Sequence, residues 1–99
     1  MLEIRQTERF GRWIARLKDR RARLAIAIRI DRMTAGHFGD VQAVGDGVKE
    51  LRLHLGPGYR IYFIERSKQV IILLCGGDKK TQARDIEAAK AMVRALKDR

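Results

Sequence analysis

Residues 48–75 contain three successive segments with strand-like patterns, and no other stretch of the chain constrains the fold as strongly. The first segment alternates leucines with polar residues, the period of two that buries one face of a strand. The third segment is apolar throughout, as an interior strand is. Turn-forming residues separate the segments, so we predict an antiparallel meander. The segments are "VKELRLHL" at 48–55, "YRIYFIE" at 59–65 and "VIILLC" at 70–75.

Two helices are predicted before the meander, after a short strand, "LEIRQT", at the N-terminus. Thr7 can cap the first helix, whose apolar residues fall on one stripe with Trp13 as a core anchor. A second helix follows over about Arg21 to Met33. We expect Leu24 and Ile28 to widen its apolar stripe, and the two helices to form an antiparallel hairpin.

The remaining residues complete one small domain. "TAGHFGDVQAVGDG", at 34–47, has four glycines and no sustained period, which predicts a loop. A last helix with an apolar stripe begins after "CGGDKKTQ". The order β-α-α-β-β-β-α predicts an α+β fold, with the helical hairpin packed on one face of a small, mainly antiparallel sheet. The opposite face is then open or only partly covered, and residues 1–99 form a single domain.

The charge of the chain favours an anionic partner. Its 99 residues include 22 Lys and Arg against 12 Asp and Glu, a formal charge of +10. Such an excess suits a nucleic acid, an acidic protein or a membrane surface, although a merely basic surface is the plain alternative. Cys75 is the one cysteine, so no internal disulfide is expected. Because the sequence shows neither a signal peptide nor an apolar run long enough to span a bilayer, we expect a soluble cytoplasmic protein.

The second face of the predicted sheet carries the candidate site. If Gly56 to Gly58 form the hairpin loop, His54 lies opposite Arg60. Arg52 then lies opposite Tyr62, and all four side chains emerge on one face. The surplus positive charge suits phosphate, because guanidinium groups match phosphate oxygens in bidentate fashion. A solvated strand face with no binding role explains the same pattern about equally well.

Charged residues beside this face extend the candidate site. Glu50 can neutralise one of the arginines. In "GGDKK", Lys79 and Lys80 follow at the start of the last helix, where free backbone N–H groups attract anions. The spacing G-x-x-x-x-G-K-[ST] of a nucleotide P-loop is absent, so ATP and GTP are not expected. His37 has no cluster of ligand-type neighbours, and we predict no metal and no cofactor.

The stretch "GVKELRLHLGPGYRIYF", followed by "VIILLCGGDKKTQARDIEAAK", resembles the RelE/ParE toxin superfamily, with the HigB-like addiction module killer proteins as the nearest branch. The resemblance covers nearly the whole chain and depends on the combination of "ELRLHLGPGYRIYF" with "LLCGGDKKTQARDI". It implies a RelE-like fold and a small cytoplasmic bacterial toxin encoded beside its antitoxin. Many members cleave messenger RNA in the ribosomal A site, whereas a sister branch poisons DNA gyrase and is not a nuclease.

The resemblance and the chemistry of metal-free RNA cleavage suggest roles for the basic residues. In this chemistry the 2′-hydroxyl of the RNA attacks the phosphate, and preorganised cations stabilise the transition state. Arg52 and Arg60 match the basic sheet residues of the nuclease branch best and would hold the scissile phosphate. Lys79, or in second place Lys80, would bind phosphate or transfer a proton.

Proton transfer and base stacking need further groups. His54 or Glu50 could act as general base. Tyr62 or Tyr59 could stack on an RNA base, although alternation places Tyr59 on the buried side, where a structural role is simpler. Several nuclease members carry a catalytic tyrosine or histidine near the C-terminus; this chain has no histidine after His54, which leaves the acid–base pair open. The predicted catalytic residues are Arg52, Arg60, Lys79, His54 and Glu50, and the predicted RNA-binding residues are Arg52, Arg60, Tyr62 and Lys80.

Three functions follow in order of preference. The first is a ribosome-dependent messenger RNA endoribonuclease that inhibits translation as the toxin of a type II toxin–antitoxin system. The second is a gyrase-targeting toxin on the same fold, and the third is a non-catalytic RNA-binding module. The expected partners are a cognate antitoxin of helix-turn-helix type, the ribosome and messenger RNA. No membrane is expected to be involved, and operator DNA would be contacted only through the antitoxin.

Overall fold

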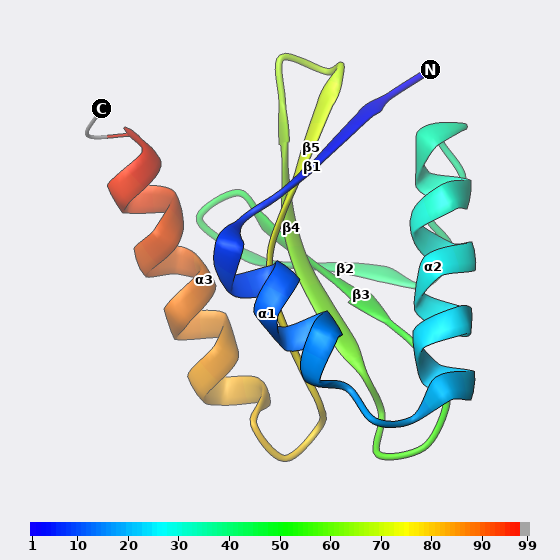
Figure 1. Cartoon of the computed structure of the whole chain (residues 1–99). Coiled ribbons are helices and arrows are strands. Elements are labelled where there is room, and N and C mark those ends of the chain that lie inside the picture. The colour runs from blue at the N-terminus through cyan, green and yellow to red at the C-terminus, as the bar shows by residue number, and fades with distance from the viewer. Residues whose placement is uncertain (98–99) are drawn as a thin grey trace.

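The computed structural model describes residues 1–97 as an α+β fold, which confirms the predicted class (Figure 1). One sheet with strand order β1-β5-β4-β3-β2 holds all the strands of the described residues. β1 pairs with β5 in parallel, and the other neighbours are antiparallel. None of the described helices has both the length and the apolarity to cross a bilayer. The elements are β1 (Glu3–Gln6), α1 (Glu8–Arg16), α2 (Arg20–Thr34), β2 (Val41–Gly45), β3 (Val48–Arg52), β4 (Arg60–Arg66), β5 (Val70–Gly77) and α3 (Gln82–Lys97).

β2 is a strand that the sequence analysis missed. Residues 34–47 are predicted to be a loop, but Val41–Gly45 form an edge strand antiparallel to β3. Asp46 and Gly47 make a two-residue turn between the two strands, and both have positive φ, 56° and 79°. Asp-Gly between two strands is a strong local signal for a hairpin of this kind, because both positions need the left-handed region. The Asp46-Gly47 pair is present in the sequence, and the predicted loop over residues 34–47 is corrected to include the strand β2.

α1 and α2 cover one face of the sheet, as predicted (Figure 1). Phe10 of α1 and Ile26 of α2 are buried in one cluster with Leu51 of β3. Thr7 begins α1 in the predicted way, since its Oγ1 accepts from the backbone N–H of Phe10 at 3.1 Å. The same hydroxyl donates to the carbonyl of Leu74 at 2.6 Å, so the cap also fastens α1 to β5.

The apolar stripe of α2 is narrower than predicted. Ile26 and Met33 are buried together with Ala22, but Leu24 and Ile28 are exposed by 64% and 43%. A helix turns by about 100° per residue, so a residue two positions before or after Ile26 points about 200° away from it. The prediction that Leu24 and Ile28 widen the buried stripe is therefore wrong.

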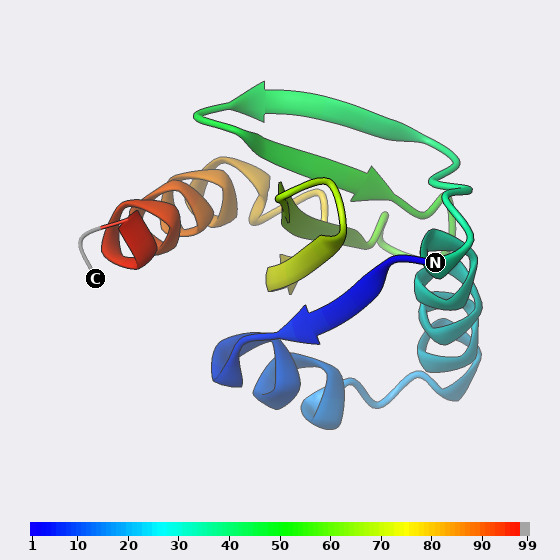
Figure 2. The same ribbon diagram turned by 90° about the horizontal axis from the view of Figure 1, so that it is seen from above.

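α3 covers part of the second face of the sheet. Figure 2 shows α2 and α3 on opposite sides of the strands. Ala89 and Val93 of α3 pack with Val48, Tyr62 and Leu74 in a second buried cluster. The apolar stripe of the last helix needs an apolar surface, and this face of β4 and β5 supplies it. Of the two predicted alternatives, an open face and a partly covered one, the structure confirms the partly covered face.

Gly76 and Gly77 let two layers approach the end of β5 from opposite sides. A Cβ on Gly76 would overlap the ring of Trp13 in α1, and a Cβ on Gly77 would overlap the carboxylate of Asp85 in α3. The prediction that Trp13 anchors the core agrees with this close contact.

We expect Gly77→Ala to lower the free energy of unfolding by about 1–3 kcal/mol, because Asp85 or the strand must move to admit the methyl group. The measurement is urea denaturation followed by circular dichroism. Gly11→Ala is the matched control: Gly11 lies inside α1, where alanine is favoured over glycine by about 0.5–1 kcal/mol. Equal effects of the two substitutions would contradict the prediction.

Candidate functional site

A cleft of about 500 Å³ lies beside the loop that joins β3 to β4, and we call it the β3–β4 cleft. It brings together Arg52, His54, Arg60 and Lys79, four of the seven predicted site residues. The remaining wall is residues 55–58, which contain the Gly-Pro-Gly turn. Both glycines of that turn have positive φ, so the chain can reverse closely beside the basic side chains.

β3 and β4 pair two residues away from the predicted register. Arg52 lies opposite Arg60, and Glu50 lies opposite Tyr62. The turn closes over residues 55–58, where the N–H of Gly58 donates to the carbonyl of Leu55 at 3.1 Å. It therefore starts one residue before the predicted loop. As a result two guanidinium groups face each other across the strands, an arrangement that needs a carboxylate to offset the repulsion.

Glu50 supplies that carboxylate from beneath the cleft. Its side chain is 1% exposed, and its Oε2 accepts hydrogen bonds at 2.9 Å from the Tyr62 hydroxyl and from Nε2 of Gln82. The Nε atoms of Arg52 and Arg60 each lie 3.7 Å from one of its oxygens. A carboxylate enclosed in this way cannot take a proton from a substrate in the cleft. The prediction of Glu50 as a general base is therefore corrected to a role in positioning the arginines.

Arg60 and Arg52 are held firmly and differ in exposure. The side chain of Arg60 is 10% exposed, and its Nη1 donates to the carbonyl of Gly58 at 3.3 Å. The side chain of Arg52 is 28% exposed, and its Nη2 donates to Gln42 of β2. Among residues 1–97, neither Nε atom has a hydrogen-bond partner. Both Nε atoms are buried and lie toward the Glu50 carboxylate beneath the cleft, so a ligand in the cleft can be reached only by the terminal nitrogens of the two guanidinium groups.

Tyr62 is the clearest error among the predicted site residues. Its side chain is fully buried under α3, and its hydroxyl is used by Glu50. Burial, and then the hydrogen bond to the Glu50 carboxylate, raise the pKa of Tyr62 far above the usual tyrosine range. It cannot stack on a base. Tyr59 is buried on the other face, edge-on to Trp13 at 6.4 Å between ring centroids, as alternation predicted.

His54 forms part of an exposed pair that includes a residue missed by the sequence analysis. Its side chain is 76% exposed, and Nε2 lies 2.6 Å from Oδ2 of Asp40. This hydrogen bond, with the nearby charge of Arg52, lowers the pKa of the Asp40 carboxyl. Asp40 immediately precedes β2 and is brought to His54 only by the strand pairing, so no local sequence signal could have found it.

The two predicted lysines take different positions. Lys79 lines the β3–β4 cleft, and its N–H donates to the carbonyl of Pro57 at 3.4 Å. Lys80 is exposed and lies outside the residues that line this cleft; its N–H donates to Oδ1 of Asp78 at 2.9 Å. The cleft thus combines three basic side chains, Arg52, Arg60 and Lys79, with the buried carboxylate of Glu50 below them.

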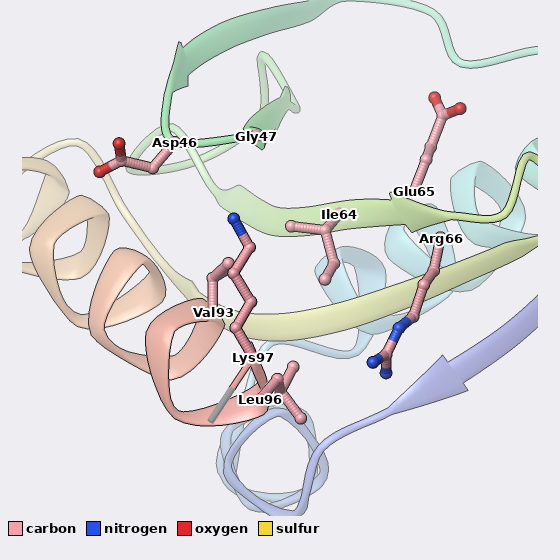
Figure 3. Close-up of a pocket in the computed structure, with 8 residues that line it drawn as sticks. All are labelled: Asp46, Gly47, Ile64, Glu65, Arg66, Val93, Leu96 and Lys97. Carbon is pink, nitrogen blue, oxygen red and sulfur yellow. The ribbon is translucent and has the colours of Figure 1, made fainter. Parts of the chain in front are cut away.

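Other hollows lie on the protein surface, and two of them differ in charge. One, which we call the α3 groove, has a volume of about 240 Å³ and lies between β4 and the end of α3 (Figure 3). Its apolar wall is formed by Ile64, Val93 and Leu96, and its rim mixes two acidic with two basic side chains, so it offers no surplus charge. The other, between α1 and α3, is described below. Within residues 1–97, no three His, Cys, Asp or Glu side chains converge as metal ligands would.

Comparisons with known proteins agree with this architecture. Residues 1–97 match the family described as "Phage derived protein Gp49-like (DUF891)". A protein of Haemophilus influenzae (strain KW20 Rd) is 44% identical over 95 residues, which cover 96% of each chain. Among solved structures, a chain in the crystal structure of the intact E. coli RelBE toxin–antitoxin complex matches with a TM-score of 0.67 at 14% identity, covering 79% of this chain and 96% of that one. The predicted RelE-like fold is confirmed.

We expect Glu50→Gln to lower the free energy of unfolding by about 3 kcal/mol, because it leaves two partly buried guanidinium groups without their carboxylate. Glu65→Gln is the matched control, since Glu65 pairs with Lys49 at 2.9 Å on the exposed surface and its loss should cost less than about 1 kcal/mol. Urea denaturation measures both. Similar losses would show that the Glu50 carboxylate is not needed to hold the arginines.

Stability should fall as the pH rises from about 9 to 11. Burial of Cys75 raises the pKa of its thiol from 9.0 to about 11. In that range the thiol is protonated in the folded state and ionised in the unfolded state, so the folded state binds more protons and each rise in pH favours unfolding. Urea midpoints across this range should fall less steeply for Cys75→Ala than for the parent chain. Identical slopes would contradict the prediction.

Proposed function

This chain belongs to the family of phage-derived Gp49-like proteins, and we propose that it is the toxin of a toxin–antitoxin pair that cleaves messenger RNA on the ribosome. Its RelE-like fold supports the toxin assignment. Within the superfamily we place it beside the HigB-like proteins, on the combined motifs "ELRLHLGPGYRIYF" and "LLCGGDKKTQARDI".

The observation that carries this proposal is the cation cluster of the β3–β4 cleft. Arg52, Arg60 and Lys79 line one concave surface, and the buried Glu50 fixes both arginines from below. Donors that are already in place stabilise developing charge on a phosphate without reorganisation, and such electrostatic stabilisation is usually the largest single contribution to catalysis. The cleft therefore suits the transition state of a phosphoryl transfer.

The proposed reaction uses the RNA's own 2′-hydroxyl as nucleophile. The 2′-oxygen bonds to phosphorus while its proton passes to a base, and the bond from phosphorus to the 5′-oxygen breaks as that oxygen gains a proton. Arg60 and Arg52 hold the phosphate oxygens. His54 is the exposed imidazole at the cleft and is proposed as the base, with Asp40 orienting the ring. Lys79 is proposed to donate the proton that the leaving 5′-oxygen gains.

The proposed partners follow from the fold and the charge. The matched chain comes from a toxin–antitoxin complex, which supports a cognate antitoxin here, and we propose one of the helix-turn-helix type. The formal charge of +10 favours both an acidic antitoxin segment and the ribosome's RNA. Operator DNA would be reached through the antitoxin. We propose the cytoplasm as the place of action.

The test is cleavage of a defined messenger RNA in a reconstituted translation system, with and without ribosomes, with the 5′ ends mapped by primer extension. We expect cuts only when ribosomes are present. Arg60→Lys, which keeps the charge and loses the guanidinium fork, should slow cleavage by about 100-fold. Lys79→Ala should also slow it. Arg94→Ala is the control, because it removes an exposed charge about 18 Å along α3 from Gln82 and should cleave normally.

Each variant must first show the circular dichroism spectrum and thermal transition of the parent chain. Intact messenger RNA with folded, antitoxin-free protein would overturn the nuclease proposal. Inhibition of gyrase supercoiling would then assign the activity of the sister branch. RNA binding without either activity would identify a binding module.

A further inference from the structure

A second basic cleft, of about 410 Å³, lies between α1 and α3, and we call it the α1–α3 cleft. Four arginines line it, and three of them come from one helix. On α1 the basic positions are spaced by three and four residues, which places them on one side of the helix. The fourth arginine stands near the start of α3. The arginines are Arg9, Arg12, Arg16 and Arg84.

The positive charge of this cleft is largely uncompensated. Arg12 pairs with Glu8 at 3.0 Å, an exposed pair one helical turn apart. Within residues 1–97, no carboxylate lies at ion-pair distance from Arg9, Arg16 or Arg84. The one acidic residue in the wall, Asp85, is buried, and its Oδ2 accepts the Thr81 hydroxyl at 2.5 Å.

The two basic clefts lie near neighbouring residues at the end of β5. Gly77 pairs with Arg60, which lines the β3–β4 cleft, while the preceding Gly76 lines the α1–α3 cleft. β1 pairs with β5 only as far as Leu73, so the outer edge of β5 beyond that point has no strand beside it among the described residues. A single extended polyanion that contacted both clefts would pass this strand end.

We propose that the α1–α3 cleft binds the sugar–phosphate backbone of the RNA strand whose scissile phosphate lies in the β3–β4 cleft. This inference rests on the proposed function and adds a second binding surface to it. Guanidinium groups match phosphate oxygens, and a nucleic acid offers a phosphate at every nucleotide. The proximity of the clefts favours RNA over an acidic peptide. Under the proposed function RNA occupies the β3–β4 cleft, so the same strand can extend into the α1–α3 cleft.

The test compares short and long RNA that cannot be cleaved. Fluorescence anisotropy measures binding of a labelled 2′-O-methyl 12-mer to the full chain at several salt concentrations, and an NMR titration measures binding of a trinucleotide. For the double variant Arg9→Gln, Arg16→Gln, the dissociation constant for the 12-mer should rise at least about tenfold. The slope of its logarithm against that of salt should shrink by about 1.4, as expected for two lost contacts to a single strand. The trinucleotide should bind as before.

Arg20→Gln, Arg21→Gln is the matched control, because both arginines are exposed at the start of α2 and do not line this cleft, and 12-mer binding should fall far less. Equal losses for both double variants, or for both RNA lengths, would overturn the inference in favour of unspecific charge. Unchanged 12-mer binding by the Arg9→Gln, Arg16→Gln variant would also overturn the inference. If this variant then lost binding to poly-glutamate, the cleft would be assigned to an acidic protein. The binding assay uses RNA that cannot be cleaved. Its result therefore does not depend on the outcome of the cleavage assay.

Discussion

The fold and the candidate site depend on one buried carboxylate. Glu50 lies on β3 and accepts hydrogen bonds from Tyr62 of β4 and Gln82 of α3. It also lies close to the guanidinium groups of two arginines. Removing a carboxylate from water is costly, and hydrogen bonds with neighbouring opposite charges offset the cost only when they are well placed. The position of α3 on the sheet and the position of the arginines are therefore set by the same group.

This arrangement explains why the cleft can be basic without being disordered. Arg52 and Arg60 would repel each other if they faced water alone across the strand pair. With Glu50 below and the Gly58 carbonyl beside it, Arg60 has almost no freedom before a ligand arrives. A phosphate that binds there loses little ordering entropy, which favours tight binding.

The sequence predicted the elements well and the register poorly. Thr7 and the alternating Leu51, Leu53 and Leu55 act locally, so their roles could be recognised from their neighbours. The Gly-Pro-Gly turn permits more than one pairing of the flanking strands, and a shift of two residues preserves which face each side chain takes. For that reason Arg52 and Arg60 were assigned to the correct surface but with the wrong partners. Tyr62, Asp40 and Gln82 acquire their surroundings from distant elements, which no local pattern records.

The parallel pairing of β1 with β5 has a consequence for how the chain is made. The cap of α1 reaches across 67 positions to bond the carbonyl of Leu74, and Gln82 reaches back from still later in the chain to Glu50. During synthesis β1 cannot pair with β5, and α1 cannot be bonded to it, until most of the chain has left the ribosome. Contacts so distant in sequence form slowly. A nascent chain therefore contains its arginines long before the clefts that they line can assemble. These clefts form only when nearly all of the chain has been synthesised.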